Sequence, residues 1–161
     1  MILQAELEDK NKKGFTLVEL LIVISIIVIL AATSVPIYGN IQISSQLNEN
    51  SSQIIQTLRT AKERSIAGFN NQNHGVKFEP GKHILYQGES YSLRNPDYDR
   101  EIYLNDDLSF YFDLNGLGEL NDINFSLSKG IPNKIGTIEL SHSTKGPRNI
   151  IINEMGIVKE E

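Results

Sequence analysis

The sequence contains no cysteine and no tryptophan among its 161 residues. Without cysteine, the chain has neither a disulfide framework nor a thiolate-ligated metal site. This absence leaves the compartment open, because many exported domains also lack disulfides. Basic residues are fewer than acidic ones, and the formal net charge is −5 at pH 7. A broad basic face is therefore not expected, and we predict no direct binding to nucleic acid.

Signals for catalysis are equally sparse. The three histidines, His74, His83 and His142, show no His-x-x-x-His or Glu-x-x-His spacing, and each is expected in or beside a turn or an exposed strand. Several serines are explained by helix-surface polarity, since none lies in a Gly-x-Ser-x-Gly setting: Ser44, Ser45, Ser51, Ser52 and Ser65. We therefore predict no enzymatic activity, no cofactor and no metal site.

Two polar segments have a faint likeness to ion sites. Residues 113–119 read Asp-Leu-Asn-Gly-Leu-Gly-Glu and place oxygen-bearing side chains two residues apart, as calcium loops do. Residues 97–101 read Asp-Tyr-Asp-Arg-Glu and form a second polar stretch. Turn formation and solvation explain the same residue types, so both segments are interpreted first as ordinary loops.

One long hydrophobic segment dominates the N-terminal part. From Phe15 to Val35, Glu19 is the only charged residue. At about 1.5 Å per residue this segment forms a helix of roughly 30 Å, enough to cross the hydrocarbon core of a bilayer. A carboxylate within such a segment is energetically costly, and its presence therefore suggests that Glu19 has a function. The preceding basic residues predict a cytoplasmic N-terminus and an external C-terminal part: Lys10, Lys12 and Lys13.

Residues 1–14 are polar and charged, and they end in Lys-Lys-Gly. They contain no apolar periodicity that would support a helix, so they are interpreted as a targeting leader. An ordinary secretory signal is the competing interpretation. Its cleavage site would lie in the Ala-Ala-Thr-Ser stretch at residues 31–34, which follows an apolar core of signal-peptide length.

The helical pattern resumes after Pro36, where the missing backbone donor is expected to kink the helix. Apolar residues then recur on one helical face, at spacings of 4, 7, 4 and 3: Ile43, Leu47, Ile54, Leu58 and Ala61. Polar residues fill the other side, so this part is amphipathic and is expected to pack on an apolar surface. Gly68 and the asparagine-rich stretch at residues 70–73 are expected to end the helix.

Beyond residue 74 the pattern changes to short strands. Turn residues separate them at intervals of about ten residues, the spacing of an antiparallel sheet. The predicted strands are 75–79, 83–86, 101–104, 108–112, 123–127, 135–140, 149–152 and 156–158, and the first two form a hairpin around Pro80-Gly81. Residues 88–99 are expected to form an exposed loop. The predicted fold is α+β, with a long N-terminal transmembrane and amphipathic α-helix packed on a small antiparallel β-sheet domain.

Residues 13–20, Lys-Gly-Phe-Thr-Leu-Val-Glu-Leu, resemble the class III signal of type IV pilins and pseudopilins. The resemblance implies that a prepilin peptidase cuts between Gly14 and Phe15 and methylates the new N-terminus at Phe15. It also implies an assembly role for Glu19 and a helix kink at Pro36. A glycine suits such a cut, because the absence of Cβ allows the protease to approach the scissile bond closely.

The role of Glu19 follows from charge. Cleavage would create an α-amino group at Phe15, roughly one helical turn away. In the low dielectric of a helix bundle, a carboxylate and an ammonium attract strongly, and leaving either one unpaired is expensive. The hypothesis is that Glu19 pairs with the N-terminus of a neighbouring subunit and so selects subunit register. The alternative is a carboxylate that is merely solvated at the headgroup boundary.

The C-terminal part is similar to the H-type minor pseudopilins of type II secretion and to related minor type IV pilins. The similarity rests on residues 58–67, 136–140, 150–152 and 156–158. The cysteine pair that closes the C-terminal loop of many major pilins is missing, which argues against that role. The implied segments are a leader at 1–14, a transmembrane and filament-core helix at 15–36, an amphipathic helix at 37–68 and a β-domain at 69–161.

The resemblance implies a structural subunit of a type IV pilus-like filament, with type II protein secretion favoured. The alternatives are a minor pilin of a type IV pilus or of a DNA-uptake filament, and a monomeric membrane-anchored β-domain that binds a ligand. The implied partners are the prepilin peptidase, other pilin-like subunits, an inner-membrane assembly platform and the bacterial cytoplasmic membrane itself. The implied location is that membrane, crossed once, with later incorporation into an extracytoplasmic filament.

Overall fold

The computed structural model describes residues 14–105, 107–116 and 121–161, and it describes the backbone but not the side chains of residues 33–38. The chain divides into two compact units, Met1–Asn40 and Ile41–Glu161. The predicted leader therefore lies outside the described residues, apart from Gly14.

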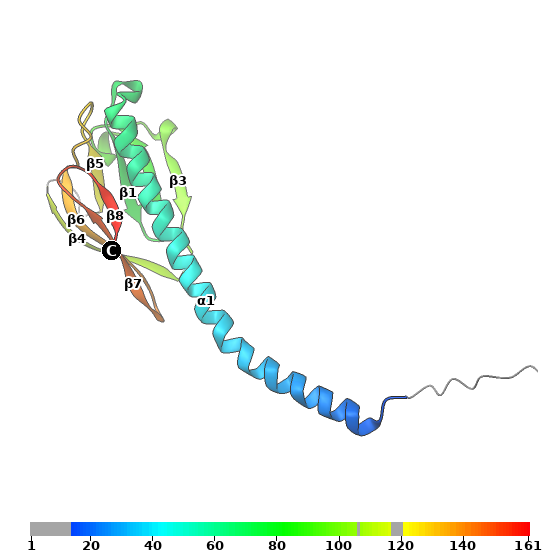
Figure 1. Ribbon diagram of the computed structural model, residues 1–161. Helices are drawn as coiled ribbons and strands as arrows, with labels where there is room; N and C mark the ends of the chain where they lie inside the picture. The colour runs from blue at the N-terminus through cyan, green and yellow to red at the C-terminus, as the bar shows by residue number, and fades with distance from the viewer. Residues whose placement is uncertain (1–13, 106, 117–120) are drawn as a thin grey trace, which may run out of the picture. The chain divides into compact units, whose positions relative to one another are not determined.

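Helix α1, Leu17–Ile66, contributes to both units (Figure 1). At its N-terminus the Glu19 backbone N–H donates to Thr16 Oγ1 at 3.2 Å, so Thr16 caps the first turn. At its C-terminus Gly68 takes the left-handed conformation, with φ of 65°, which favours glycine. Both predicted helix ends are thus confirmed to within two residues.

Two predictions within α1 concern residues 15–36. The backbone of residues 33–38 is helical. The kink expected at Pro36, whose side chain lies outside the described ones, stays a prediction. For the expected transmembrane segment, no helix in the described part of the chain proves both long and apolar enough to cross a membrane.

In the second unit, the predicted apolar face of α1 is confirmed. Leu47, Ile54, Leu58 and Ala61 are all buried, and Ile43 packs partly against the same core. Ser51 and Ser65 lie on this side and are also buried, although the sequence placed them on the polar surface. The amphipathic part of the helix therefore finds its apolar partner within the chain.

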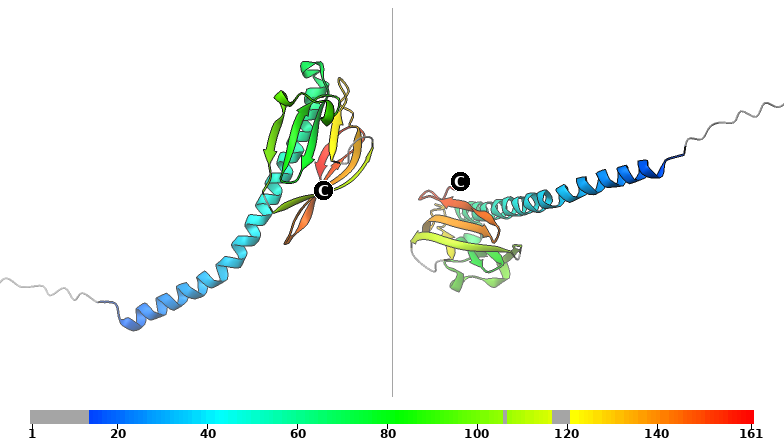
Figure 2. Two further views of the ribbon diagram at one scale, coloured as in Figure 1. Left: turned by 180° about the vertical axis from the view of Figure 1, so that it is seen from behind. Right: turned by 90° about the horizontal axis from the view of Figure 1, so that it is seen from below.

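The β-strands form two four-stranded antiparallel sheets (Figures 1 and 2). The first has the order β3-β2-β1-β5, with β3 Arg100–Tyr103, β2 Lys82–Gln87, β1 His74–Glu79 and β5 Asp122–Phe125. The second has the order β4-β6-β7-β8, with β4 Leu108–Gly116, β6 Lys134–His142, β7 Lys145–Ile152 and β8 Val158–Glu160. Each predicted strand overlaps one of these. The division into two sheets was not foreseen, because turn spacing does not specify which strand β4 pairs with.

One hydrophobic core joins α1 to both sheets. It contains Ile54 and Leu58 of the helix, Phe125 of the first sheet and Ile138 of the second. Aromatic rings also bridge the sheets, since the Phe78 ring on β1 lies 5.2 Å from the Phe110 ring on β4. The second unit is therefore held together by long-range contacts between segments that are distant in sequence.

The loop predicted at 88–99 contains two short 3₁₀ turns, η2 Tyr91–Leu93 and η3 Pro96–Tyr98, while a third, η1 Phe69–Asn71, follows α1. Arg94 organises the segment, because its guanidinium lies 3.8 Å from the centroid of the Tyr91 ring and its Nε lies 2.7 Å from Asp99 Oδ2. The loop is thus partly ordered by one arginine, although most of its residues are exposed.

Candidate processing and assembly site

The bond between Gly14 and Phe15 precedes the first helical residue, Leu17. A Cβ built on Gly14 would have no atom within 4 Å, and the Phe15 side chain is 84% exposed. Other described residues therefore enclose neither Gly14 nor the Phe15 side chain. The structure places the predicted cleavage residues in an accessible position before α1.

Glu19 lies in the first turn of α1 and is exposed. A negative side chain in this turn interacts favourably with the partial positive charge at a helix N-terminus. Among the described residues, Glu19 forms no ion pair. The carboxylate is therefore available to a cation that the described part of the chain does not supply.

The surface of α1 that follows Glu19 is apolar except at Ser25, whose hydroxyl donates to the Leu21 carbonyl at 2.8 Å. Its large side chains are 46–65% exposed: Leu20, Leu21, Ile22, Val23, Ile24, Ile26, Ile27, Val28, Ile29 and Leu30. Consecutive helical residues point about 100° apart, so such a run leaves no polar stripe. Exposed apolar surface of this extent marks a site of interaction with a partner or a membrane.

The histidines are placed differently from the sequence expectation. His83 on β2 is fully buried, and its Nε2 lies 3.0 Å from Thr57 Oγ1 on α1. The Thr57 hydroxyl donates to the Gln53 carbonyl, so Thr57 Oγ1 accepts a hydrogen bond from the Nε2–H group of His83. Burial lowers the pKa of His83 from 6.5 to about 4, which keeps the ring neutral at physiological pH.

His74 on β1 is also buried, and its backbone N–H donates to Ser65 Oγ at 2.9 Å. Burial, followed by the nearby charge of Arg64, lowers the pKa of His74. Both histidines lie near turns, as expected, but the expected exposure was wrong, because each packs against α1 through contacts that local sequence does not show. Both histidines are therefore constituents of the helix–sheet interface.

The structure describes the two segments with a likeness to ion sites to different extents. Asp113 belongs to β4, whereas residues 117–119 lie outside the described residues. In the other segment Asp99 bonds to Arg94, and Glu101 bonds to Lys82 at 2.8 Å. Among the residues that the structure describes, no three acidic or histidine side chains gather as metal ligands.

A buried polar cluster was missed by sequence reasoning. The Tyr86 hydroxyl donates to Asp122 Oδ1 at 2.6 Å, and the Asn124 amide donates to the Tyr86 oxygen at 3.0 Å. Lys134 Nζ donates to the Asp122 carbonyl at 2.9 Å, and burial raises the pKa of the Asp122 carboxyl. Gly75 lies opposite Tyr86, where any Cβ would collide with the ring and with the Ile123 carbonyl. These residues bind β1, β2 and β5 to one another.

Comparison with known proteins adds to this geometry. Residues 9–35 match the family model described as the prokaryotic N-terminal methylation motif. Two fimbrial proteins of Pseudomonas aeruginosa are each 44% identical over 57 residues, which cover 35% of this chain and 36% of each relative. The chain thus matches only about a third of the length of these curated relatives.

Two solved structures share the fold. Both are of the minor pseudopilin EpsH from the type II secretion system of Vibrio cholerae, and both superpose with a TM-score of 0.54. One is 14% identical and covers 72% of this chain and 96% of its own, while the other is 16% identical and covers 73% and 94%. The fold is that of pilin-like proteins. The chain thus combines a stretch that matches the N-terminal methylation motif with the fold of a solved minor pseudopilin.

Proposed function

We propose that the chain is a structural subunit, a minor pseudopilin or minor pilin, of a type IV pilus-like filament. The observation that carries this proposal is the exposed, almost entirely apolar surface of α1 at residues 20–30, which lies within the stretch that matches the methylation motif. Such a surface is unstable in water, and burial is worth about 25 cal/mol per Å². Helices of sister subunits would supply that burial, and an assembly platform in the inner membrane would bring them together.

Processing would prepare this segment for assembly. A prepilin peptidase would cut between Gly14 and Phe15 and methylate Phe15, leaving residues 15–36 as the filament-core helix. Glu19 would then pair with the α-amino group of Phe15 on a neighbouring subunit. The pairing is supported by the lack of an ion-pair partner for Glu19 among the described residues and by its exposed position.

Before assembly, the subunit would reside in the bacterial cytoplasmic membrane. The methylation motif and the exposed apolar side chains of residues 17–30 support this location. The N-terminus would be cytoplasmic, since lysines precede the apolar segment. Residues 37–68 and the β-domain at 69–161 would lie outside, and we propose no enzymatic activity for them.

Intact-mass measurement of the membrane-extracted protein tests the processing step. The expected mass corresponds to loss of residues 1–14 and addition of one methyl group. An intact leader, or a cut after Ala32, would overturn the proposal. Crosslinking in cells tests the assembly step, because a filament subunit gives a ladder with other pilin-like chains whereas a monomeric ligand-binding domain does not.

The fold similarity to a type II secretion pseudopilin favours a secretion filament. The stretch that is 44% identical to fimbrial proteins favours the second candidate, a pilus or DNA-uptake filament. Deletion of the gene separates the two. Loss of secreted proteins with pili retained supports the first candidate, and loss of surface pili or DNA uptake with secretion retained supports the second.

A further inference from the structure

Strand β3 is the outermost strand of the first sheet. Within the described residues it pairs with β2 on one side, with Arg100 opposite Leu85 and Ile102 opposite His83. Figure 1 shows β3 at the edge of its sheet, beside the C-terminal part of α1. An edge strand presents unpaired backbone N–H and C=O groups, onto which another strand can be added.

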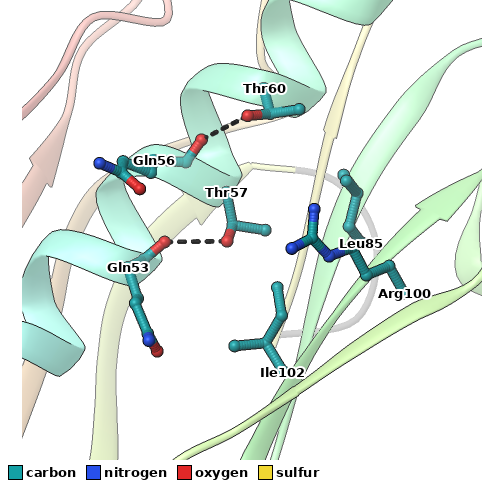
Figure 3. A pocket seen from close by; sticks show the side chains of 7 residues that line it. All are labelled: Gln53, Gln56, Thr57, Thr60, Leu85, Arg100 and Ile102. Atoms are coloured by element: carbon teal, nitrogen blue, oxygen red, sulfur yellow. Dashed lines mark hydrogen bonds between the residues drawn. The ribbon is translucent and has the colours of Figure 1, made fainter.

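A hollow of about 230 Å³ lies between this strand and α1. Leu85 and Ile102 provide its apolar part, while Gln53, Gln56 and Thr60 of α1 provide its polar wall. Figure 3 shows the Arg100 guanidinium directed across the hollow toward the helix. The Thr60 hydroxyl donates to the Gln56 carbonyl, so this side chain offers the hollow an acceptor. Arg100 is the one charged residue among those that line the hollow.

The charge of Arg100 is not neutralised by the part of the chain that the structure describes. Neighbouring cations have carboxylate partners, since Lys82 pairs with Glu101 at 2.8 Å and Arg94 pairs with Asp99 at 2.7 Å. Arg100 forms no such pair among the described residues. A guanidinium with five donors in a fixed fork is complementary to a carboxylate. The hollow thus combines one cation, polar side groups and an apolar floor.

We propose that β3 and this hollow bind an extended acidic segment of another protein chain by strand addition. Alternate residues of a strand point to the same face, so the segment would carry a carboxylate opposite Arg100 and an apolar side chain over Ile102, two positions apart. Backbone hydrogen bonds supply the affinity in this mode of recognition, and side-chain pockets supply the specificity. A small free anion would gain only the interaction with one exposed arginine, which is weak.

Binding of short labelled peptides to the full-length protein in detergent micelles tests the proposal. The first peptide is threonine-rich, with one Glu and one Val two positions apart, and the second has Lys in place of Glu. Wild type is expected to bind the Glu peptide up to about fivefold more tightly, the range of an exposed ion pair. Arg100→Gln should abolish the preference, and Arg100→Glu should invert it.

A matched control is Lys159→Gln, which removes one exposed positive charge from the edge strand β8 of the other sheet. It should leave the peptide preference unchanged. Equal binding of the two peptides, absence of binding, or the same loss with Lys159→Gln as with Arg100→Gln would overturn the proposal.

A second arm tests strand addition itself. Methylating the alternate backbone nitrogens of the Glu peptide that face β3 removes the N–H donors to β3 and places methyl groups against the strand, but it keeps the carboxylate, and binding should fall at least tenfold. If the methylated peptide binds equally well, or if acetate competes as strongly as the unmodified peptide, the hollow is an anion site only and the proposed strand docking is wrong.

Discussion

The two parts of α1 differ in where their partners are. In residues 17–30 the large apolar side chains are exposed, whereas in residues 41–66 Leu47, Ile54 and Leu58 are buried against the chain's own sheets. The second part carries a polar stripe opposite its apolar face, and the first part has none. One helix can therefore combine a part that is buried against its own domain with a part whose apolar side chains remain exposed. The C-terminal part packs on the chain's own sheets, and the N-terminal part leaves its apolar side chains exposed.

The largest expected effect concerns Glu19, because its removal would leave a neighbour's α-amino group unpaired in an apolar surrounding. Such a loss costs about 3–5 kcal/mol. Glu19→Ala is therefore expected to reduce filament incorporation more than a hundredfold, measured by crosslinking in cells, with unfolding of the β-domain unchanged. Glu49→Ala removes an exposed carboxylate from the same helix and should assemble normally. Undiminished incorporation of Glu19→Ala would disprove the pairing.

The next effect separates the two parts of α1 directly. Leu58 is fully buried, so Leu58→Ala should lower the free energy of unfolding by about 2–5 kcal/mol, measured by urea titration in micelles. Val28 is 60% exposed, and Val28→Ala should leave that free energy unchanged while weakening incorporation into filaments. If both substitutions lowered the free energy of unfolding equally, the proposed difference between the two parts of α1 would be wrong.

A pH titration sharpens the description of the buried part. The pKa of His83 is about 4 in the folded chain and 6.5 in the unfolded chain, so between these values the unfolded state binds more protons. Stability is therefore retained above pH 6.5 and lost as the pH falls toward 4, by about 3 kcal/mol in all.

The His83→Gln variant isolates this contribution, because a glutamine amide can still donate to Thr57 Oγ1. Urea titrations of wild type and variant at several pH values should show a smaller loss of stability in the variant. If the free energy of unfolding of the two proteins changed with pH in the same way, the loss of stability at low pH would not come from His83. His74 and Asp122 also have shifted pKa values, but they contribute equally to both proteins. Their contributions therefore cancel when the free energy of unfolding of the variant is subtracted from that of wild type at each pH.

The smallest effect is expected at the start of the exposed part. Thr16→Ala removes the acceptor for the Glu19 N–H and should destabilise the first turn by about 1 kcal/mol. Amide hydrogen exchange should become faster at residues 17–20 and stay unchanged beyond residue 41. Thr16→Ser keeps the acceptor and serves as the control, and faster exchange in Thr16→Ser as well would contradict a capping role.

Much of the fold could be predicted because its signals are local. The apolar face from Ile43 to Ala61 follows helical periodicity, and the β1–β2 hairpin follows from Pro80-Gly81 between two strand-like runs. The environment of His83 could not be predicted in this way. Its burial depends on Thr57, which is 26 positions earlier in the sequence and has no local pattern that connects it to β2.

The candidate sites divide in the same manner. The residues proposed for processing and assembly, Gly14, Phe15 and Glu19, lie within one short stretch, so the motif that they form can be recognised in the sequence. The hollow at Arg100 could not be predicted from the sequence, because its lining residues belong to α1, β2 and β3, and only folding brings these elements together.

The sequence by itself determined where the helix begins and ends, which of its faces is apolar, where the strands lie and where the N-terminal methylation motif lies. These features depend on residue periodicity, turn chemistry and short motifs. The tertiary structure alone decided the division into two sheets, the burial of the histidines and the edge position of β3. Strand partners and burial depend on contacts between distant segments, and the free energy of those contacts is defined only when the whole core is assembled.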